Sequence, residues 1–159
     1  MQKVHIKEQG NQKINPFFLP ILFLVGGGGY YLLEILFRGY SHWTMALCGG
    51  LCLSLIYLAN QRLSNRSLIL RAATGAFIIT AVEFITGIIV NSCLHWGIWD
   101  YSHLPFNLMG QISLAFSLLW FLLCIPVCLG CSALQEVSRR LRKSTVEKQN
   151  NKKDRFLSP

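Results

Sequence analysis

Long apolar runs alternate with short polar segments along this sequence. An α-helix needs about 20 mostly apolar residues to cross a bilayer, and each run is close to that length. The pattern therefore predicts an all-α fold, an integral membrane four-helix bundle whose spans form one domain over residues 17–134. The apolar runs cover residues 17–37, 43–59, 72–96 and 107–134, and basic polar segments flank them at 1–16 and 135–159.

The composition also indicates a membrane protein. Hydrophobic residues make up 52% of the chain and charged residues 14%, with a mean hydropathy of +0.41, whereas soluble domains are about 25% charged. Four spans and their loops leave no room among the 159 residues for a separate soluble catalytic domain. The first run follows a basic segment, as in a signal peptide, but it is too long and lacks a small-residue cleavage site, so we expect it to be retained.

The lysine and arginine residues are distributed unevenly between the connections. There are three before the first run, one after it, three after the second, none after the third and eight in the tail. Because such residues are kept on the cytoplasmic side, we expect both termini inside (N-in/C-in) and segments 38–42 and 97–106 outside. The net charge of +8 then reflects topology, with no basic surface for nucleic acid, and the tail is expected to bind anionic lipid.

Cysteine and histidine residues provide possible metal ligands. The six cysteines lie inside or at the edges of apolar runs, which favours a packing role. Three histidines and an acid, His42, His95, His103 and Asp100, are expected at the outer face and could together supply a zinc site. Their spacing matches no HExxH-type motif. We therefore predict no metal and no cofactor.

Glu83 is the most informative residue, because it lies close to the middle of the third run. An acidic side chain there costs a few kcal/mol to insert unless it has a partner or a wet cavity. Thr80, Thr86, Gly87 and Asn91 lie at helical spacing from Glu83 on the same face, so this stripe should point into the protein. Two interpretations stay open: Glu83 binds a cation, proton or polar substrate, or it is a hydrogen-bonded packing residue.

A second acidic residue, Glu34, precedes Arg38 by four positions near the end of the first run. Residues at this spacing are neighbours on a helix, so the simplest interpretation is an intrahelical ion pair that lowers the cost of inserting both charges. The alternative is a contact between Arg38 and Asp100 in the outer turn after the third run.

The connection between the third and fourth runs reads as an ordered turn. Asp100 and Ser102 can accept local backbone N–H groups, and Asn107 is a suitable N-cap for the fourth helix. Gln111 is expected inside that helix, where its amide would bond a neighbouring helix. The turn can also serve as an entrance that recognises a molecule. Its residues are Trp99, Asp100, Tyr101, Ser102, Pro105 and Phe106.

Several of these motifs occur together in a known family. The chain resembles, from about residue 29 to residue 120, the bacterial ABC-transporter type IV family of small multispanning permeases. The resemblance implies a multi-pass protein of the bacterial cytoplasmic membrane and a transport role with a separate ATPase subunit. The motifs are YLLE at 31–34, RGYSHWTM at 38–45, GGLC at 49–52, EFITG at 83–87, Asn91, WDYS at 99–102, PFN at 105–107 and GQI at 110–112.

The leading hypothesis for function is a permease-like membrane component, substrate unknown, that forms a homo-oligomer or joins an ATPase subunit. The alternative is a membrane interaction or assembly protein without transport activity. An intramembrane hydrolase or transferase is a third possibility, but the sequence shows no nucleophile–base arrangement and no Walker A motif. The candidate substrate or ion path consists of Glu83, Glu34, Arg38, Asn91, Asp100, Asn107 and Gln111.

Overall fold

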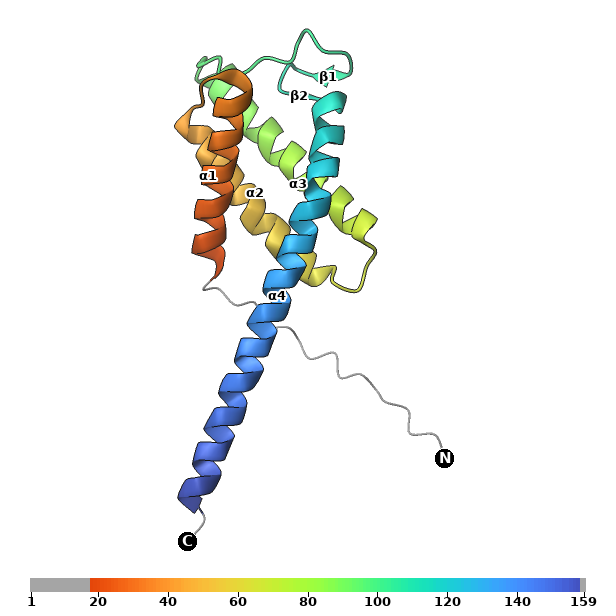
Figure 1. The fold of residues 1–159 in the computed structure, drawn as a ribbon. Coiled ribbons are helices and arrows are strands. Elements are labelled where there is room, and N and C mark those ends of the chain that lie inside the picture. The colour runs from red at the N-terminus through yellow and green to blue at the C-terminus, as the bar shows by residue number, and fades with distance from the viewer. Residues whose placement is uncertain (1–17, 158–159) are drawn as a thin grey trace, which may run out of the picture.

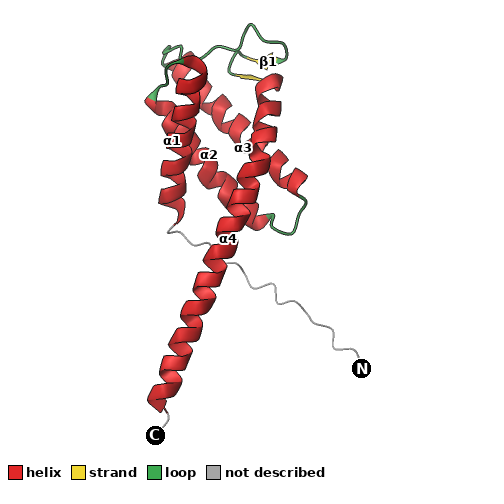
Figure 2. Ribbon diagram, in the orientation of Figure 1, coloured by secondary structure: helices red, strands yellow, loops and turns green. Residues whose placement is uncertain are grey.

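The computed structural model describes residues 18–157 and consists of four long helices with a small hairpin (Figures 1 and 2). All four helices are long and apolar enough to cross a membrane, which confirms the all-α membrane fold. The predicted segment 1–16 lies outside the described residues. The elements are α1 Phe18–Arg38, α2 Trp43–Arg62, α3 Leu68–Gly87, the π-helical turn η1 Ile88–Cys93, β1 Asn107–Leu108, β2 Ile112–Ser113 and α4 Leu114–Leu157.

The two ends of the bundle differ. The α1–α2 and α3–α4 connections lie together at one end, which we call the cap end, and we call residues 94–113 the cap. The α2–α3 connection lies at the opposite end, the tail end, where α4 continues beyond the other helices (Figure 1). The predicted fourth run ended at residue 134, whereas α4 continues to Leu157.

Helices α1 and α2 pack with their backbones almost in contact, because glycines face each other. A Cβ atom added to Gly49 would lie 2.6 Å from the Gly26 carbonyl oxygen, and one added to Gly27 would lie 2.5 Å from the Ala46 oxygen. Small residues allow this approach at membrane helix interfaces. Gly26 and Gly27 therefore allow this close packing, while an added Cβ at Gly28 or Gly29 would meet nothing within 4 Å.

Two helix boundaries differ from the predicted runs. Helix α3 begins at Leu68, so Arg71, which was assigned to the preceding loop, lies within its first turns. Helix α4 begins at Leu114 and not at Asn107, because the antiparallel hairpin β1–β2 occupies 107–113. The hairpin satisfies backbone groups through Asn107↔Ser113 pairing, which competes with a helical start.

The buried side chains form three clusters along the bundle. Cysteines contribute to two of them, as the packing interpretation predicted, and none of the six cysteines forms a disulfide. Cys128 and Cys131 have C-x-x-C spacing but belong to different clusters. The clusters are Met45, Val90, Ile98 and Trp99; Ile56, Ala72, Cys124 and Cys128; and Leu22, Tyr57 and Cys131.

Candidate functional site

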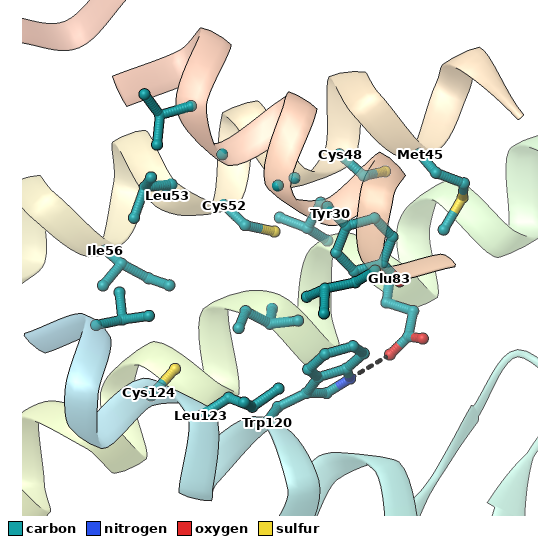
Figure 3. A pocket seen from close by; sticks show the side chains of 18 of the residues that line it. Tyr30, Met45, Cys48, Cys52, Leu53, Ile56, Glu83, Trp120, Leu123 and Cys124 are labelled. Atoms are coloured by element: carbon teal, nitrogen blue, oxygen red, sulfur yellow. Dashed lines mark hydrogen bonds between the residues drawn. The ribbon is translucent and has the colours of Figure 1, made fainter. Parts of the chain in front are cut away.

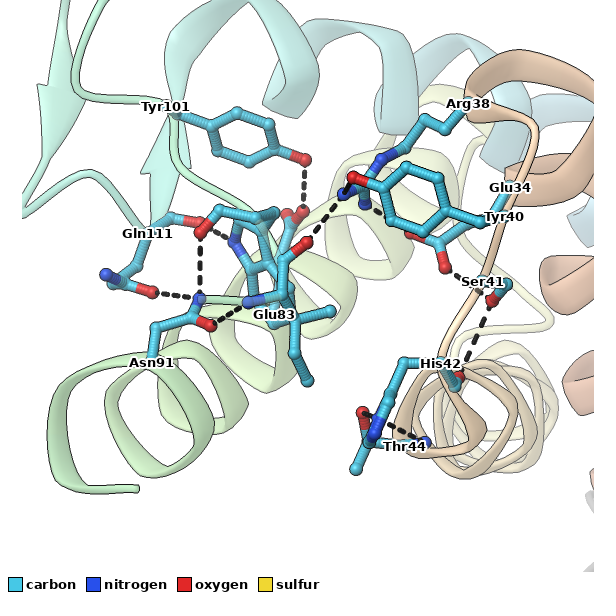
Figure 4. A network of polar contacts seen from close by, with 12 residues as sticks. Glu34, Arg38, Tyr40, Ser41, His42, Thr44, Glu83, Asn91, Tyr101 and Gln111 are labelled. Carbon is cyan, nitrogen blue, oxygen red and sulfur yellow. Dashed lines mark hydrogen bonds and ion pairs between the residues drawn. The ribbon is translucent and has the colours of Figure 1, made fainter. Parts of the chain in front are cut away.

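Glu83 is buried on α3 with hydrogen bonds to both carboxylate oxygens. Tyr101 in the cap donates its hydroxyl to Oε1 at 3.2 Å, and Trp120 on α4 donates its indole N–H to Oε2 at 3.0 Å (Figures 3 and 4). Among the side chains that the structure describes, no lysine, arginine or histidine forms an ion pair with Glu83. The carboxyl group therefore joins α3, α4 and the cap through neutral donors alone.

The stripe around Glu83 points into the protein as predicted. Thr80 donates its hydroxyl to Ser117 on α4 at 3.2 Å. The Thr86 hydroxyl lies 3.0 Å from the Cys48 sulfur on α2. One polar face of α3 thus contacts both neighbouring helices.

Asn91 fastens the cap to the end of α3. Its amide nitrogen donates to the Trp99 carbonyl at 3.0 Å and to Gln111 Oε1 at 2.9 Å, while its oxygen accepts the Ile98 N–H at 2.7 Å (Figure 4). It lies in η1, and wider π turns often occur at functional positions. All hydrogen-bonding groups of this amide are used within the protein.

Gln111 lies in the turn of the cap hairpin, and not inside α4 as predicted. Its backbone carbonyl accepts the Trp99 indole N–H at 2.9 Å. A Cβ atom at Gly87 would come within 2.4 Å of Gln111 Oε1, so the missing side chain at Gly87 makes room for the amide. Trp99 is only 6% exposed and packs in a core cluster with Met45 and Val90.

The exposed part of the cap is held by its own side chains. The Asp100 carboxylate accepts the Ser102 N–H at 2.8 Å and the Ser102 hydroxyl at 2.9 Å, which confirms the predicted turn. These two bonds hold the pKa of Asp100 below its ordinary value. Gly110 has a φ of +68°, and a Cβ there would lie 2.8 Å from Asp100 Oδ1. Pro105 and Phe106 lie on the exposed surface of the cap.

Asn107 does not cap α4. Its amide nitrogen donates to the Leu104 carbonyl at 2.8 Å, and its oxygen accepts the Gly110 N–H at 3.1 Å. The residue before α4 is Ser113, whose hydroxyl accepts the Phe116 N–H at 3.5 Å. An asparagine that can cap a helix can also close a turn, and here the turn is formed.

Glu34 and Arg38 form the predicted intrahelical ion pair, with a distance of 3.0 Å between Oε1 and Nη1. The second oxygen of Glu34 accepts the Ser41 hydroxyl at 2.6 Å. Arg38 also donates to the Ile98 carbonyl at 2.5 Å (Figure 4). It therefore reaches the cap through a backbone carbonyl, and the alternative contact with Asp100 is not formed.

The histidines predicted near the cap end do not converge. In the part of the chain that the structure describes, no group of three or more His, Cys, Asp or Glu residues could hold a metal ion. His42 instead contacts Trp43 and Trp96, with ring centroids 5.5 and 5.4 Å away. Those two tryptophans are exposed, as residues at a membrane interface would be.

A cavity of about 260 Å³ lies below Glu83, between all four helices (Figure 3). Its wall is almost entirely apolar, and Glu83 is the only Asp, Glu, Lys, Arg or His among the described residues that line it. Tyr30 and Trp120 flank it at the Glu83 end, with ring centroids 5.8 Å apart. Sequence reasoning placed Glu83 inside the bundle but could not predict the cavity, which depends on how α1 and α4 separate.

Sequence reasoning also missed a polar cluster at the tail end. Arg71 donates to the Asn60 side-chain oxygen at 3.2 Å and to the Ser132 hydroxyl at 2.8 Å. The Asn60 nitrogen also bonds Ser132 at 3.1 Å. This cluster joins α2, α3 and α4. The overlooked signal was an asparagine and an arginine at the ends of two consecutive apolar runs.

Comparison with known proteins gives a family. A family model described as "Putative ABC-transporter type IV" matches residues 30–148, which include Glu34, Arg38, the cap and the cavity end of α4. Neither the search of curated proteins nor the search of solved structures found a match. Since the matched region covers most of the 159 residues, this multi-pass membrane chain belongs to the ABC-transporter type IV family.

Proposed function

We propose that this chain is the permease-like membrane component of an ABC-type transport system, with Glu83 as its central polar site. The family supports a transport role. The observation that carries the proposal is the buried Glu83 carboxylate at the end of an apolar cavity, bonded to the cap above it. An ionisable group inside a membrane bundle commonly marks a substrate or ion path.

The distribution of basic residues supports the orientation of this component. The cap would face the outside of a bacterial cytoplasmic membrane, and the basic tail would face the cytoplasm, where it can contact anionic lipid. The other candidate path residues then lie at the outer mouth, where they hold or cover the route to Glu83. These residues are Glu34, Arg38, Asn91, Asp100, Asn107 and Gln111.

The energy for transport must come from a partner. The sequence contains no Walker A motif to cradle nucleotide phosphates, so ATP hydrolysis would belong to a separate subunit. The four helices surround a cavity of about 260 Å³, and four helices make a poor pore alone, which favours assembly with further helices, either of a second copy or of another membrane subunit. The extension of α4 at the tail end offers a cytoplasmic contact for the ATPase.

The test replaces Glu83 in the native host. Inside-out membrane vesicles from wild-type and Glu83→Gln cells are supplied with ATP, and their solute content is measured by mass spectrometry. We expect that the ATP-dependent movement of at least one solute falls about tenfold or more in the variant. A tenfold lower rate corresponds to the loss of about 1.4 kcal/mol of stabilisation in the rate-limiting step. Glu136→Gln is the control, because that acid pairs with exposed arginines on α4. Equal transport by correctly inserted Glu83→Gln would remove Glu83 from the mechanism.

A second candidate function is membrane assembly or docking without transport, and the length of α4 favours it. The helix runs to Leu157 and leaves the bundle (Figure 1), and its last part is rich in lysine and arginine. Truncation after Glu136 separates the two functions. A truncated chain that inserts and still supports vesicle transport would exclude an essential docking role for the tail.

A further inference from the structure

The cavity below Glu83 opens sideways toward lipid between α1 and α4. These two helices are not a closely packed pair. Side chains bridge them at the Glu83 end through Tyr30 and Trp120 and at the tail end through the cluster that contains Leu22 and Cys131. Between these bridges, Val25 of α1 lines the cavity and is also 60% exposed. A molecule dissolved in the bilayer could therefore enter without crossing the cap.

Among the described residues, none that lines the Glu83 end of the cavity carries a positive charge. An ionised carboxylate in apolar surroundings is costly unless a cation compensates it, and Glu83 receives only a phenol and an indole hydrogen bond. A carboxylate has about four acceptor positions, so two remain. The rings of Tyr30 and Trp120 lie beside this position, and aromatic faces attract cations.

The rest of the cavity suits a slim apolar body. Glycines and cysteines on α1, α2 and α4 line it where larger side chains would fill it, and Ile56 and Cys124 lie at the opposite end from Glu83 (Figure 3). The volume of about 260 Å³ is at the small end of the range of about 300–1,000 Å³ for ligand pockets. The two ends therefore fit an alkyl chain and a compact cationic head.

We infer that this cavity binds amphiphilic amines, which enter from the bilayer between α1 and α4 and place the protonated amine against Glu83, Tyr30 and Trp120. The inference rests on the proposed function, of which it names the substrate class. The amine supplies the charge and the donors that Glu83 lacks, and the apolar chain extends toward Ile56. A neutral lipid chain would fill the same space but leave the carboxylate uncompensated.

Photolabelling of the full chain in lipid nanodiscs tests this inference. The probe is decylamine with a diazirine at the end of its chain, compared with the alcohol of the same length at equal membrane concentration. We expect the amine to label residues around Ile56 about tenfold more than the alcohol, and unlabelled decylamine to compete. In Glu83→Gln, labelling by the amine should fall to the level of the alcohol.

A pair of glycine variants keeps the test decisive if Glu83→Gln folds poorly. Gly29 and Gly28 both have open space around an added Cβ, but only Gly29 lines the cavity. Gly29→Leu should therefore abolish labelling around Ile56, whereas Gly28→Leu should retain it, with folding of both checked by size-exclusion chromatography.

Two results would overturn the inference. One is equal labelling by amine and alcohol, which would identify a lipid-chain niche, and the other is equal labelling of the two glycine variants. Binding and transport can fail separately. Labelling that depends on Glu83, together with normal vesicle transport in Glu83→Gln, would leave the amine site and remove Glu83 from the transport mechanism. Loss of transport without amine labelling would leave the permease and exclude this substrate class.

Discussion

Asn91 and Glu83 lie about two helical turns apart on one stripe that runs along α3 and its continuation η1, yet their surroundings differ. The Asn91 amide makes three hydrogen bonds to the cap, which use both of its N–H donors and its oxygen. Glu83 makes two bonds to neutral donors and borders an apolar cavity. Where buried polar groups satisfy one another they stabilise a fold, whereas a buried acid with unused acceptors is suited to binding. This difference supports a stabilising role for the cap network and the functional role proposed for Glu83.

Removal of the Asn91 amide should have the largest effect on stability. Asn91→Ala leaves the Ile98 N–H and the Gln111 amide without their partner, and each unsatisfied buried group costs about 1–3 kcal/mol. We expect a loss of about 3 kcal/mol in the free energy of unfolding, measured by denaturant titration in detergent. Asn65→Ala in the exposed α2–α3 connection is the control and should change little. A small effect of Asn91→Ala would contradict the role of the network.

Gly87→Ala should disturb the same network from the other side. The new Cβ would lie 2.4 Å from Gln111 Oε1, so the Gln111 amide must move away from Asn91. Overpacking of this kind costs about 1–3 kcal/mol, and we expect about 2 kcal/mol in the same titration.

Gly130→Ala on α4 is the matched control for Gly87→Ala. Its Cβ meets nothing within 4 Å, and alanine favours a helix over glycine by up to about 1 kcal/mol. The two substitutions should therefore have opposite signs. Destabilisation by both would indicate a general intolerance of these helices and not a specific contact.

Tyr101→Phe tests the link between the cap and Glu83. The substitution removes the hydroxyl that donates to Glu83 and keeps the ring stacked on Phe116 at 4.5 Å. We expect a loss of about 1 kcal/mol in stability, the usual net value of one hydrogen bond. Labelling by the amine probe should persist, because Glu83 stays available. Labelling that disappears with Tyr101→Phe would place the hydroxyl itself in the binding site.

Asp100→Asn should have the smallest effect, because this carboxyl group is fully exposed. The hydrogen bonds from Ser102 lower the pKa of Asp100 in the folded protein. The ionised carboxylate therefore contributes stability at pH values above the unfolded-state pKa of about 3.9. This contribution is lost as the pH falls through the folded-state pKa. Wild type should melt slightly above Asp100→Asn at about pH 7, and the difference should shrink at about pH 3. A difference that grows with acidification would have the wrong sign.

The sequence predicted those features that depend on neighbours along the chain. The spacing of Glu34 and Arg38 predicted their ion pair, and the stripe around Glu83 predicted the buried face of α3. The sequence did not predict features at positions where one residue type favours two different local structures. Asn107 could cap a helix or close a turn, and the hairpin that it stabilises moved the start of α4 to Leu114.

Hydrophobic length and helical periodicity by themselves determined the four spans and the inward position of Glu83, because a helix in lipid satisfies its own backbone and must bury its polar stripe. Only the tertiary structure decided what that stripe meets. Asn91 forms hydrogen bonds with the backbone of the cap, Arg38 donates to the Ile98 carbonyl and not to Asp100, and Glu83 borders an apolar cavity. These outcomes depend on the distances between helices. The packing of glycines and cysteines across the bundle sets those distances, and no local sequence pattern encodes them.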